Sequence, residues 1–315
     1  MDREAKAHFF EQQRPRLLRL AYGLLGSRAE AEDVVQDAYI RFELADAAQL
    51  ENREGWLTTV VTRIAIDRLR SASHQREVYP GTWLPEPLVE LRSQEQKEIT
   101  RSELSIALLF LLEQLDPIER AVFLLREAFE IPYREVARIV DKPETACRQM
   151  YIRARRRVEG ERGAAAPDFA AKRAMVDRYA IAIIEEDEQK LIEAVTEDVI
   201  FFSDGGGKVP VNVNPIVGVD RLLRFSRGLG RKYGPERFSR MQVVVNGEPG
   251  LLVFLNGRAD TVTAFRFDES RISAIYGIRN PDKLTRLPLK CQAEVQGAQS
   301  SVEVFTFQLN SPPAK

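Results

Sequence analysis

The side chains best suited to binding another molecule are basic and lie close together in residues 145–157. This segment holds five arginines and no carboxylate. Arg and Gln can make paired hydrogen bonds to base edges in the DNA major groove, and neighbouring Arg side chains can hold phosphates. We predict that Thr145, Arg148 and Gln149 read bases. The predicted phosphate contacts are Arg153, Arg155, Arg156 and Arg157.

Helices that precede this segment must position the arginines. Asp116, Pro117 and Glu119 have the order of a capped helix start, and Pro132 ends the helix that follows. Residues 133–140 then predict a shorter helix, and the residues after it predict a tight turn.

The last helix of this group carries the arginines. Residues at helical spacing predict a buried stripe on its other side: Cys147, Tyr151, Ala154 and Val158. Two helices joined by a tight turn, the second of them basic, are typical of a helix-turn-helix, which places its second helix in the major groove. The alternative is an ordinary core helix with a solvated charged face.

Composition limits the other possibilities. The chain has 315 residues, 44% of them hydrophobic, which favours two or three domains. The net charge of -1 offers no general attraction to a polyanion, so a DNA-binding surface must be local. Cys147 and Cys291 lack the spacing of metal ligands, and we predict no metal site and no cofactor. Without a signal peptide or an apolar run of roughly 18 residues, we expect a cytoplasmic protein that does not enter the membrane.

The N-terminal part predicts three helices, the first within residues 7–25. In the second, an apolar stripe leaves Asp33, Gln36 and Asp37 on the exposed side. An acidic and amide face on a rigid helix suits a protein partner that offers hydrogen-bond donors. A merely solvated face is the alternative.

The third helix, within residues 54–70, could contact nucleic acid whose bases are unpaired. Such contacts need hydrogen-bonding side chains at helical spacing. The side chains predicted to point outward are Thr58, Thr62, Arg63, Asp67 and Arg70.

Two ordered blocks of sequence resemble a known family. AEDVVQDAYIRF followed by GWLTTVVTRIAIDRLR is similar to the promoter-melting domain of bacterial extracytoplasmic-function sigma factors. LDPIERAVFLLREAFEIPYREVARIV is similar to their minus-35-binding domain. The resemblance covers about half of the chain. It implies an RNA polymerase sigma factor that directs promoter recognition and transcription initiation and performs no bond chemistry itself.

The resemblance also implies roles for the candidate residues. Asp33, Gln36 and Asp37 would dock on the clamp of core RNA polymerase, with the flap as a further contact of the factor. The basic helix would read the minus-35 element of promoter DNA. A loop at residues 45–50 would capture a flipped minus-10 base, and the third helix would support the melted strand. The implied minus-10 residues are Ala45, Gln49, Leu50, Arg63, Asp67 and Arg70.

Residues 74–103 predict an extended linker between the two helical domains. Two prolines in its WLPEP sequence disfavour helix. The sequence resembles the linker of the sigma subgroup that carries a C-terminal SnoaL-like domain. The alternative is an ordinary linker in which Trp83 and Leu84 cover nearby apolar surface.

After small residues at 160–167, the pattern changes from helical to mixed. Helices within 170–186 and 190–195 precede another near 219–229 and several strand-like runs. This order is typical of an α+β cone of curved sheet around a pocket, and it resembles the SnoaL and ketosteroid-isomerase superfamily. We therefore expect a multidomain chain: two all-α DNA-binding domains, the second a helix-turn-helix, followed by an α+β SnoaL/NTF2-like cone.

Two motifs in the last domain, SDGGGK and NPDKL, match the same subgroup. Consecutive glycines allow backbone amides to converge on an acceptor, although a hairpin turn is the plain alternative. The resemblance implies a regulatory contact between this domain and the sigma core. The residues implied are Trp83, Leu84, Pro85, Asp204, Gly205, Gly206, Gly207, Lys208, Asn280, Pro281 and Asp282.

No catalytic residue is predicted. Both histidines, His8 and His74, precede the last domain, and no Asp within it is singled out by the sequence. A regulatory domain that could hold a small ligand is therefore favoured over an enzyme. Two alternatives remain open: a helix-turn-helix regulator that needs no polymerase, and a SnoaL-type enzyme tethered to DNA.

These observations predict a division of the whole chain. Residues 1–73 would bind polymerase and the minus-10 element, and residues 104–163 the minus-35 element, with the linker at 74–103 between them. The SnoaL-like domain would cover 164–288. The extension at 289–315 contains a strand-like alternation at 302–309.

Overall fold

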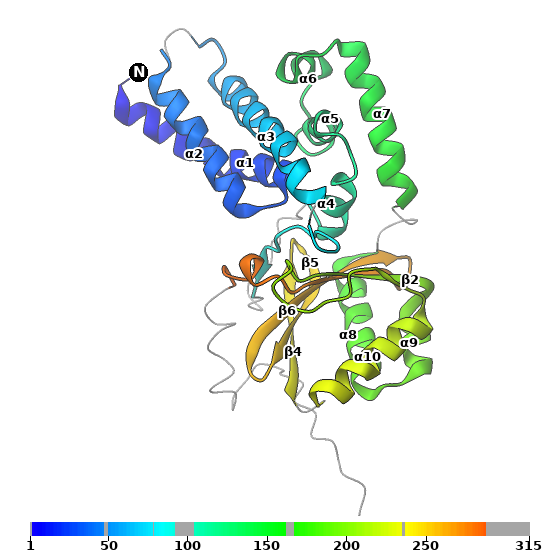
Figure 1. The fold of residues 1–315 in the computed structure, drawn as a ribbon. Coiled ribbons are helices and arrows are strands. Elements are labelled where there is room, and N and C mark those ends of the chain that lie inside the picture. The colour runs from blue at the N-terminus through cyan, green and yellow to red at the C-terminus, as the bar shows by residue number, and fades with distance from the viewer. Residues whose placement is uncertain are drawn as a thin grey trace, which may run out of the picture. The chain divides into compact units, whose positions relative to one another are not determined.

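The structure is a computed structural model that describes residues 2–46, 50–77, 79–91, 104–161, 167–234 and 237–287. The chain divides into two compact units, whose elements are labelled in Figure 1. The first joins Met1–Val78 with Leu108–Arg162, and the second joins Tyr79–Ala107 with Gly163–Lys315. Both helical sequence blocks therefore belong to one unit. Most of the segment predicted as a linker belongs to the other, which the sequence did not indicate.

The first unit begins with three helices, as predicted: α1 (Arg3–Leu25), α2 (Arg28–Leu44) and α3 (Arg53–Glu77). Local signals set their ends. Gly26 ends α1 with φ 66°, a left-handed conformation that glycine adopts without strain. Ser27 then caps α2 by accepting from the Glu30 amide. Aromatic rings fill the space between the helices: Phe10 lies 6.5 Å and Trp56 6.0 Å from the ring of Phe42.

The expectation that Thr58 and Thr62 point outward from α3 is wrong. Their exposed fractions are 1% and 0%. The Thr58 hydroxyl donates to the Glu54 carbonyl at 2.8 Å, and the Thr62 hydroxyl to the Thr58 carbonyl at 2.7 Å. Because a carbonyl one turn earlier satisfies each hydroxyl, both side chains can be buried at small cost. Arg16 of α1 also donates to Thr58 Oγ1 at 3.0 Å, so α1 contacts this side of α3.

The helix-turn-helix follows within α4 (Ile106–Leu112), α5 (Pro117–Glu127), α6 (Tyr133–Val140) and α7 (Glu144–Glu161). Asp116 caps α5 as predicted, because its carboxylate accepts from the Ile118 amide at 2.9 Å. Asp141 ends α6 in the left-handed region, with φ 53°, and starts the turn into α7. The boundary between the two units falls within α4, at Ala107 and Leu108.

A buried arginine joins the helix-turn-helix to the first three helices. Arg120 of α5 is 2% exposed. It donates to the carbonyls of Leu112 and Leu24, at 2.8 and 2.6 Å, and pairs with Glu113 at 2.6 Å. Since Leu24 lies in α1, this one guanidinium connects segments that are far apart in the sequence. The unit thus has a single packed interior across both helical blocks.

The second unit is a seven-stranded sheet in the order β1-β4-β5-β6-β7-β2-β3. The strands are β1 (Val89–Glu90), β2 (Val195–Asp204), β3 (Ile216–Val217), β4 (Phe238–Val245), β5 (Glu248–Leu255), β6 (Arg258–Asp268) and β7 (Arg271–Ile278). All neighbours pair antiparallel except β2 and β7. Asn–Gly turns join β4 to β5 and β5 to β6, and their positive φ values match the twist of a hairpin.

Three helices, α8 (Phe169–Glu185), α9 (Glu188–Ala194) and α10 (Val219–Tyr233), pack on this sheet (Figure 1). Register shifts at Phe254 and Phe267 interrupt the β5–β6 and β6–β7 ladders, and such bulges bend a sheet. The core between helices and sheet includes Met175, Tyr179 and Ile275. The predicted α+β arrangement is confirmed. The predicted strand at 302–309 and Cys291 lie outside the described residues.

Candidate functional site

The basic face of α7 lies at the surface of the first unit. The side chains predicted to contact DNA are all exposed: Thr145, Arg148, Gln149, Arg153, Arg155, Arg156 and Arg157. The opposite stripe is buried, with Cys147 and Ala154 at 0% exposure and Val158 at 1%. Tyr151, the fourth residue of the predicted stripe, is only half-buried. The predicted division of α7 into a buried and an exposed side is therefore confirmed at the other three positions.

Two arginines on this face form ion pairs at the surface. Arg148 donates to Glu144 at 2.6 Å and lies over the ring of Tyr133, 4.4 Å from its centroid. Arg153 donates to Glu119 of α5 at 2.8 Å. Exposed pairs of this kind contribute less than about 1 kcal/mol. Both guanidinium groups could therefore exchange a carboxylate for another anion at small cost.

The acidic face of α2 is also at the surface. Asp33 and Gln36 are exposed, and Asp37 is half-buried. Arg68 of α3 donates to Asp37 at 2.9 Å and lies 3.6 Å from Asp33. The Asp33 side chain remains 73% exposed, so the pairing orients the carboxylates and leaves them accessible.

Two exposed apolar residues, which were not predicted from the sequence, extend this face. Ile40 and Leu44 are 51% and 84% exposed near the end of α2. Neither belongs to the apolar stripe of that helix, so the periodicity could have indicated them. Adjacent exposed apolar side chains rimmed by polar ones can form part of a surface that binds another protein.

The predicted minus-10 residues lie on two parts of the first unit. Ala45 and Leu50 are partly exposed after α2, whereas Gln49 lies outside the described residues. Asp67 and Arg70 are exposed on α3, with 3.8 Å between carboxylate and guanidinium.

Arg63 of α3 has partners that the sequence did not predict. Its Nε donates to the Ile139 carbonyl at 3.0 Å, and its Nη2 donates to the Arg138 carbonyl at 2.9 Å. These carbonyls lie at the end of α6, where the helix itself supplies no further amide. The guanidinium thus caps α6 and joins α3 to the helix-turn-helix.

In the second unit, the residues of the glycine-rich motif converge on the segment predicted as a linker. We call this contact between residues 79–90 and the motifs SDGGGK and NPDKL the linker dock, and Asp204 lies at its centre. Its carboxylate accepts from the Leu84 amide at 2.9 Å, the Tyr79 hydroxyl at 2.5 Å and the Gly206 amide at 3.0 Å. Lys283 pairs with the same carboxylate at 2.7 Å. With the Asp204 side chain 0% exposed, the group is buried and fully partnered, as a buried charge must be.

Lys283 and Asn280, from the NPDKL motif, hold the other side of the segment. Lys283 donates to the Leu84 carbonyl and lies over the ring of Trp83, 4.1 Å from its centroid. Asn280 donates to the Tyr79 hydroxyl at 3.0 Å. Burial raises the pKa of Tyr79 above its ordinary value, and so does its hydrogen bond to Asp204. The phenol therefore remains a neutral donor to that carboxylate.

The glycines of the motif are needed for close approach. Gly206 has φ 64°, and a Cβ placed there would lie 2.4 Å from Asn280 Cγ. A Cβ on Gly207 would lie 2.7 Å from Pro80 Cγ. Lys208 completes the turn by pairing with Asp282 at 2.6 Å. A larger residue at 206 would therefore push against Asn280, and one at 207 would push against the segment at Pro80.

The same segment continues into the sheet. Leu84, Pro85, Glu86 and Pro87 are buried. The Leu88 amide then donates to Asn246 Oδ1 at 2.9 Å, and β1 pairs with the end of β4. Tyr79, Asn246 and Lys283 are not among the residues predicted from the sequence. Lys283 stands within the NPDKL motif, and Asn246 stands in an Asn–Gly turn, so a signal existed for both.

Comparisons with known proteins identify the family. Residues 9–75 match sigma-70 region 2, and residues 105–158 match sigma-70 region 4. The ECF RNA polymerase sigma factor SigJ of Mycobacterium tuberculosis is 37% identical over 293 residues, which cover 89% of this chain and 94% of that relative. The chain belongs to the ECF sigma factors.

The sigma-factor relationship extends to the tertiary structure. The crystal structure of M. tuberculosis SigJ has a TM-score of 0.73 and 33% identity to this chain, covering 90% of it and 99% of the SigJ chain. A probable ECF sigma factor of the same organism, SigI, is 30% identical over 274 residues, or 86% of this chain and 92% of the relative. The predicted fold class, helical regions followed by a SnoaL-like α+β domain, is confirmed.

As a sigma factor, the chain directs promoter recognition and transcription initiation by RNA polymerase. Regions 2 and 4 imply binding to the core enzyme and to promoter DNA. The family assignment decides against the alternative of a regulator that acts without polymerase.

No helix within the described ranges is long and apolar enough to cross a membrane. Among the same residues, no group of three His, Cys, Asp or Glu side chains could hold a metal ion.

Proposed function

We propose that the sigma factor reads the minus-35 element with the exposed face of α7. The observation that carries this proposal is the outward arrangement of all its arginines opposite a buried stripe. Thr145, Arg148 and Gln149 lie near the start of the helix, which is the part of a recognition helix that reaches base edges. The later arginines then follow the phosphates.

We further propose that the acidic face of α2, with Ile40 and Leu44, binds the clamp of core RNA polymerase. Accessible carboxylates supply charge complementarity, and the exposed apolar side chains supply area to bury. The loop after α2, together with Asp67 and Arg70, would hold unpaired minus-10 bases. For Arg63 to join them, it must leave the carbonyls of α6.

The linker dock suggests how the second unit regulates initiation in cis. The link between regions 2 and 4 includes residues 79–90, which the second unit holds through Asp204, Lys283 and β1. An extended chain spans about 3.3 Å per residue. Residues that are docked on the second unit cannot extend in this way to increase the distance between regions 2 and 4. We propose that docking limits the distance between the two DNA-binding regions, and that release of the segment lets them separate.

Transcription in vitro with core RNA polymerase and a set of promoters that differ in spacer length tests this proposal. Asp204→Asn should change the yield of specific transcripts and their dependence on spacer length. Asp198→Asn is the matched control, because Asp198 is an exposed carboxylate on the same strand. If Asp204→Asn exposes the linker to protease while transcription from every spacer stays at the wild-type level, the regulatory proposal is wrong.

We also propose that a cavity in the second unit holds a small ligand, as the SnoaL-like fold suggested. The cavity has a volume of about 470 Å³, within the range of small-molecule sites. Its Asp260 is held by Arg279 in a paired ion bridge, with distances of 2.7 and 2.8 Å. Both oxygens of this carboxylate already accept hydrogen bonds from the chain itself, so we favour binding over catalysis.

A further inference from the structure

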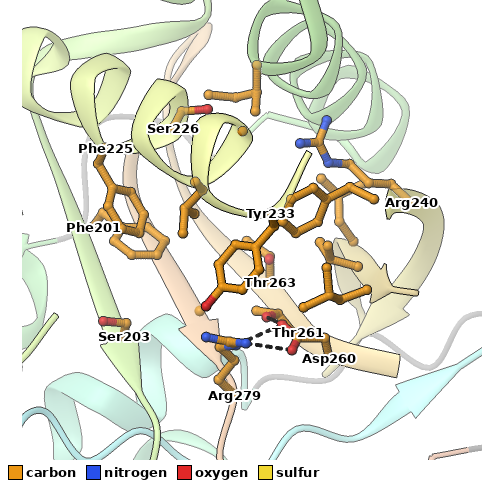
Figure 2. Close-up of a pocket in the computed structure, with 18 of the residues that line it drawn as sticks. Phe201, Ser203, Phe225, Ser226, Tyr233, Arg240, Asp260, Thr261, Thr263 and Arg279 are labelled. Carbon is orange, nitrogen blue, oxygen red and sulfur yellow. Dashed lines mark hydrogen bonds and ion pairs between the residues drawn. The ribbon is translucent and has the colours of Figure 1, made fainter. Parts of the chain in front are cut away.

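The cavity of the second unit is mainly apolar, with charged groups at separate places. Its wall includes Phe201 and Leu251 on the sheet and Phe225 and Leu229 on α10. Figure 2 shows Arg240 at the end of the cavity opposite Asp260 and Arg279. The cavity can therefore enclose an apolar body and also offer a polar group at each end.

At one end of the cavity, Asp260 and Arg279 neutralise each other. Arg279 donates both Nε and Nη2 to the carboxylate of Asp260. Its Nη1 donates to the Pro210 carbonyl at 2.9 Å, and Thr261 Oγ1 donates to Asp260 at 2.7 Å. These contacts satisfy both charges, so this end has little need of a ligand.

Arg240 is different. The residue is half-buried on the cavity wall, and burial lowers the pKa of its guanidinium. Within the described residues its hydrogen bond is a long one, 3.4 Å from Nη1 to the Ala180 carbonyl, and no carboxylate pairs with it. A cation that is partly removed from water and has no anion beside it is costly to a fold. Such a group is better explained by a partner that the chain itself does not supply.

The neighbours of Arg240 add donors. Tyr179 lines the same cavity, and burial raises its pKa to about 12 although the charge of Arg240 lowers it. The phenol is therefore protonated at neutral pH.

The charged groups that line the cavity are Lys232, Arg240 and Arg279, against Glu186 and Asp260, which leaves an excess of positive charge.

From this geometry we propose that the cavity binds a small, mainly apolar molecule with one carboxylate, which pairs with Arg240 while the aromatic side chains enclose the apolar part. This proposal names the class of ligand for the cavity. Only its expected effect on transcription rests on the regulatory role proposed above. Positive charge at one end and apolar walls elsewhere disfavour amines and highly polar sugars.

The cavity and the linker dock share a strand end, which gives the ligand a route to regulation. The Arg279 side chain lines the cavity, while its amide donates to the Asp204 carbonyl at 2.8 Å. The next residue, Asn280, holds Tyr79. A ligand that moves Arg279 would therefore shift two groups of the dock.

Calorimetric titration of the full chain with two pairs of probes tests the binding site. Each pair joins a carboxylate to its neutral amide: naphthalene-2-carboxylate with naphthalene-2-carboxamide, and octanoate with octanamide. The wild-type chain should bind at least one carboxylate about tenfold more tightly than its amide, as a charge-assisted hydrogen bond allows. Arg240→Met should remove that preference, and Arg240→Lys should keep part of it.

The control is Arg173→Gln, which removes an exposed positive charge from α8 and should leave the preference unchanged. Melting curves verify that each variant is folded. Failure of the wild-type chain to bind either carboxylate, or a preference that survives Arg240→Met, overturns the proposal. Binding that depends on Arg240 but leaves transcription unchanged would support the site and reject only the regulatory role.

Discussion

The basic face of α7 and the linker dock differ in where their polar side chains find partners. On α7 the arginines point outward, and two of them, Arg148 and Arg153, pair with neighbouring carboxylates at the surface. In the dock, Asp204 is 0% exposed and satisfied by groups from three parts of the chain. The first arrangement leaves binding capacity for another molecule, and the second uses it to hold the chain itself. Changes in the dock should therefore alter stability, whereas changes on α7 should alter DNA binding.

The largest effect is expected from Asp204→Asn, which leaves Lys283 buried without its carboxylate. The free energy of unfolding of the second unit should fall by about 3–5 kcal/mol. Urea unfolding followed by Trp83 fluorescence, in a Trp56→Phe background, measures the loss. Asp198→Asn should leave the transition in place. A wild-type midpoint for Asp204→Asn would mean that the dock contributes little to stability.

Gly206→Ala should have the next largest effect. The residue would be strained at φ 64°, and its Cβ would clash with Asn280. We expect a loss of about 1–3 kcal/mol in the same unfolding experiment. Gly228→Ala is the control, because a Cβ at this position within α10 would have no atom within 4 Å, and a helix favours alanine over glycine. Equal stability of the two variants would contradict the close approach.

On α7, Gln149→Ala and Arg156→Ala should separate base reading from phosphate binding. Each substitution should change the free energy of unfolding by no more than about 0.5 kcal/mol, because both side chains are exposed. Gln149→Ala should weaken holoenzyme binding by about 1–3 kcal/mol and relax specificity at one minus-35 position. Arg156→Ala should weaken binding to all promoters. It should also reduce the slope of the logarithm of the binding constant against the logarithm of the salt concentration by about one. Identical effects on every minus-35 variant would reject Gln149 as a base reader.

The smallest effect is expected from Glu119→Gln, which removes the surface partner of Arg153. Stability should change by less than about 1 kcal/mol, since Arg153 is largely exposed. Promoter binding at low salt should become slightly tighter, as Arg153 no longer has to leave a carboxylate. Glu135→Gln, an exposed acid on α6, controls for the loss of charge. A comparable gain from Glu135→Gln would show that only net charge matters.

Much of the first unit could be predicted because its signals are local. Asp116 and Gly26 mark helix ends within a few residues, and the spacing of Cys147 and Ala154 identifies the buried side of α7. Prediction was wrong for Thr58, because a buried threonine on a helix can satisfy its hydroxyl with a backbone carbonyl. It also missed the partners of Arg63, which lie 75 and 76 residues away.

In the second unit the sequence indicated the motifs but not their contacts. The family resemblance grouped WLPEP, SDGGGK and NPDKL, and it implied a contact with the sigma core. The structure brings the three together within one unit, around Asp204. Arg240 was not indicated at all, because a single arginine in an apolar strand has no spacing to identify it.

By itself, the sequence determined the helices, the longer strands and the basic and acidic faces, since caps and periodicities act over neighbouring residues. Its two motif blocks indicated the family. Only the tertiary structure decided that the linker docks on the SnoaL-like domain, and that Arg240 stands opposite a closed ion pair in an apolar cavity. Asp204 meets Leu84 across 120 residues and Lys283 across 79, and such contacts depend on the packing of the whole sheet.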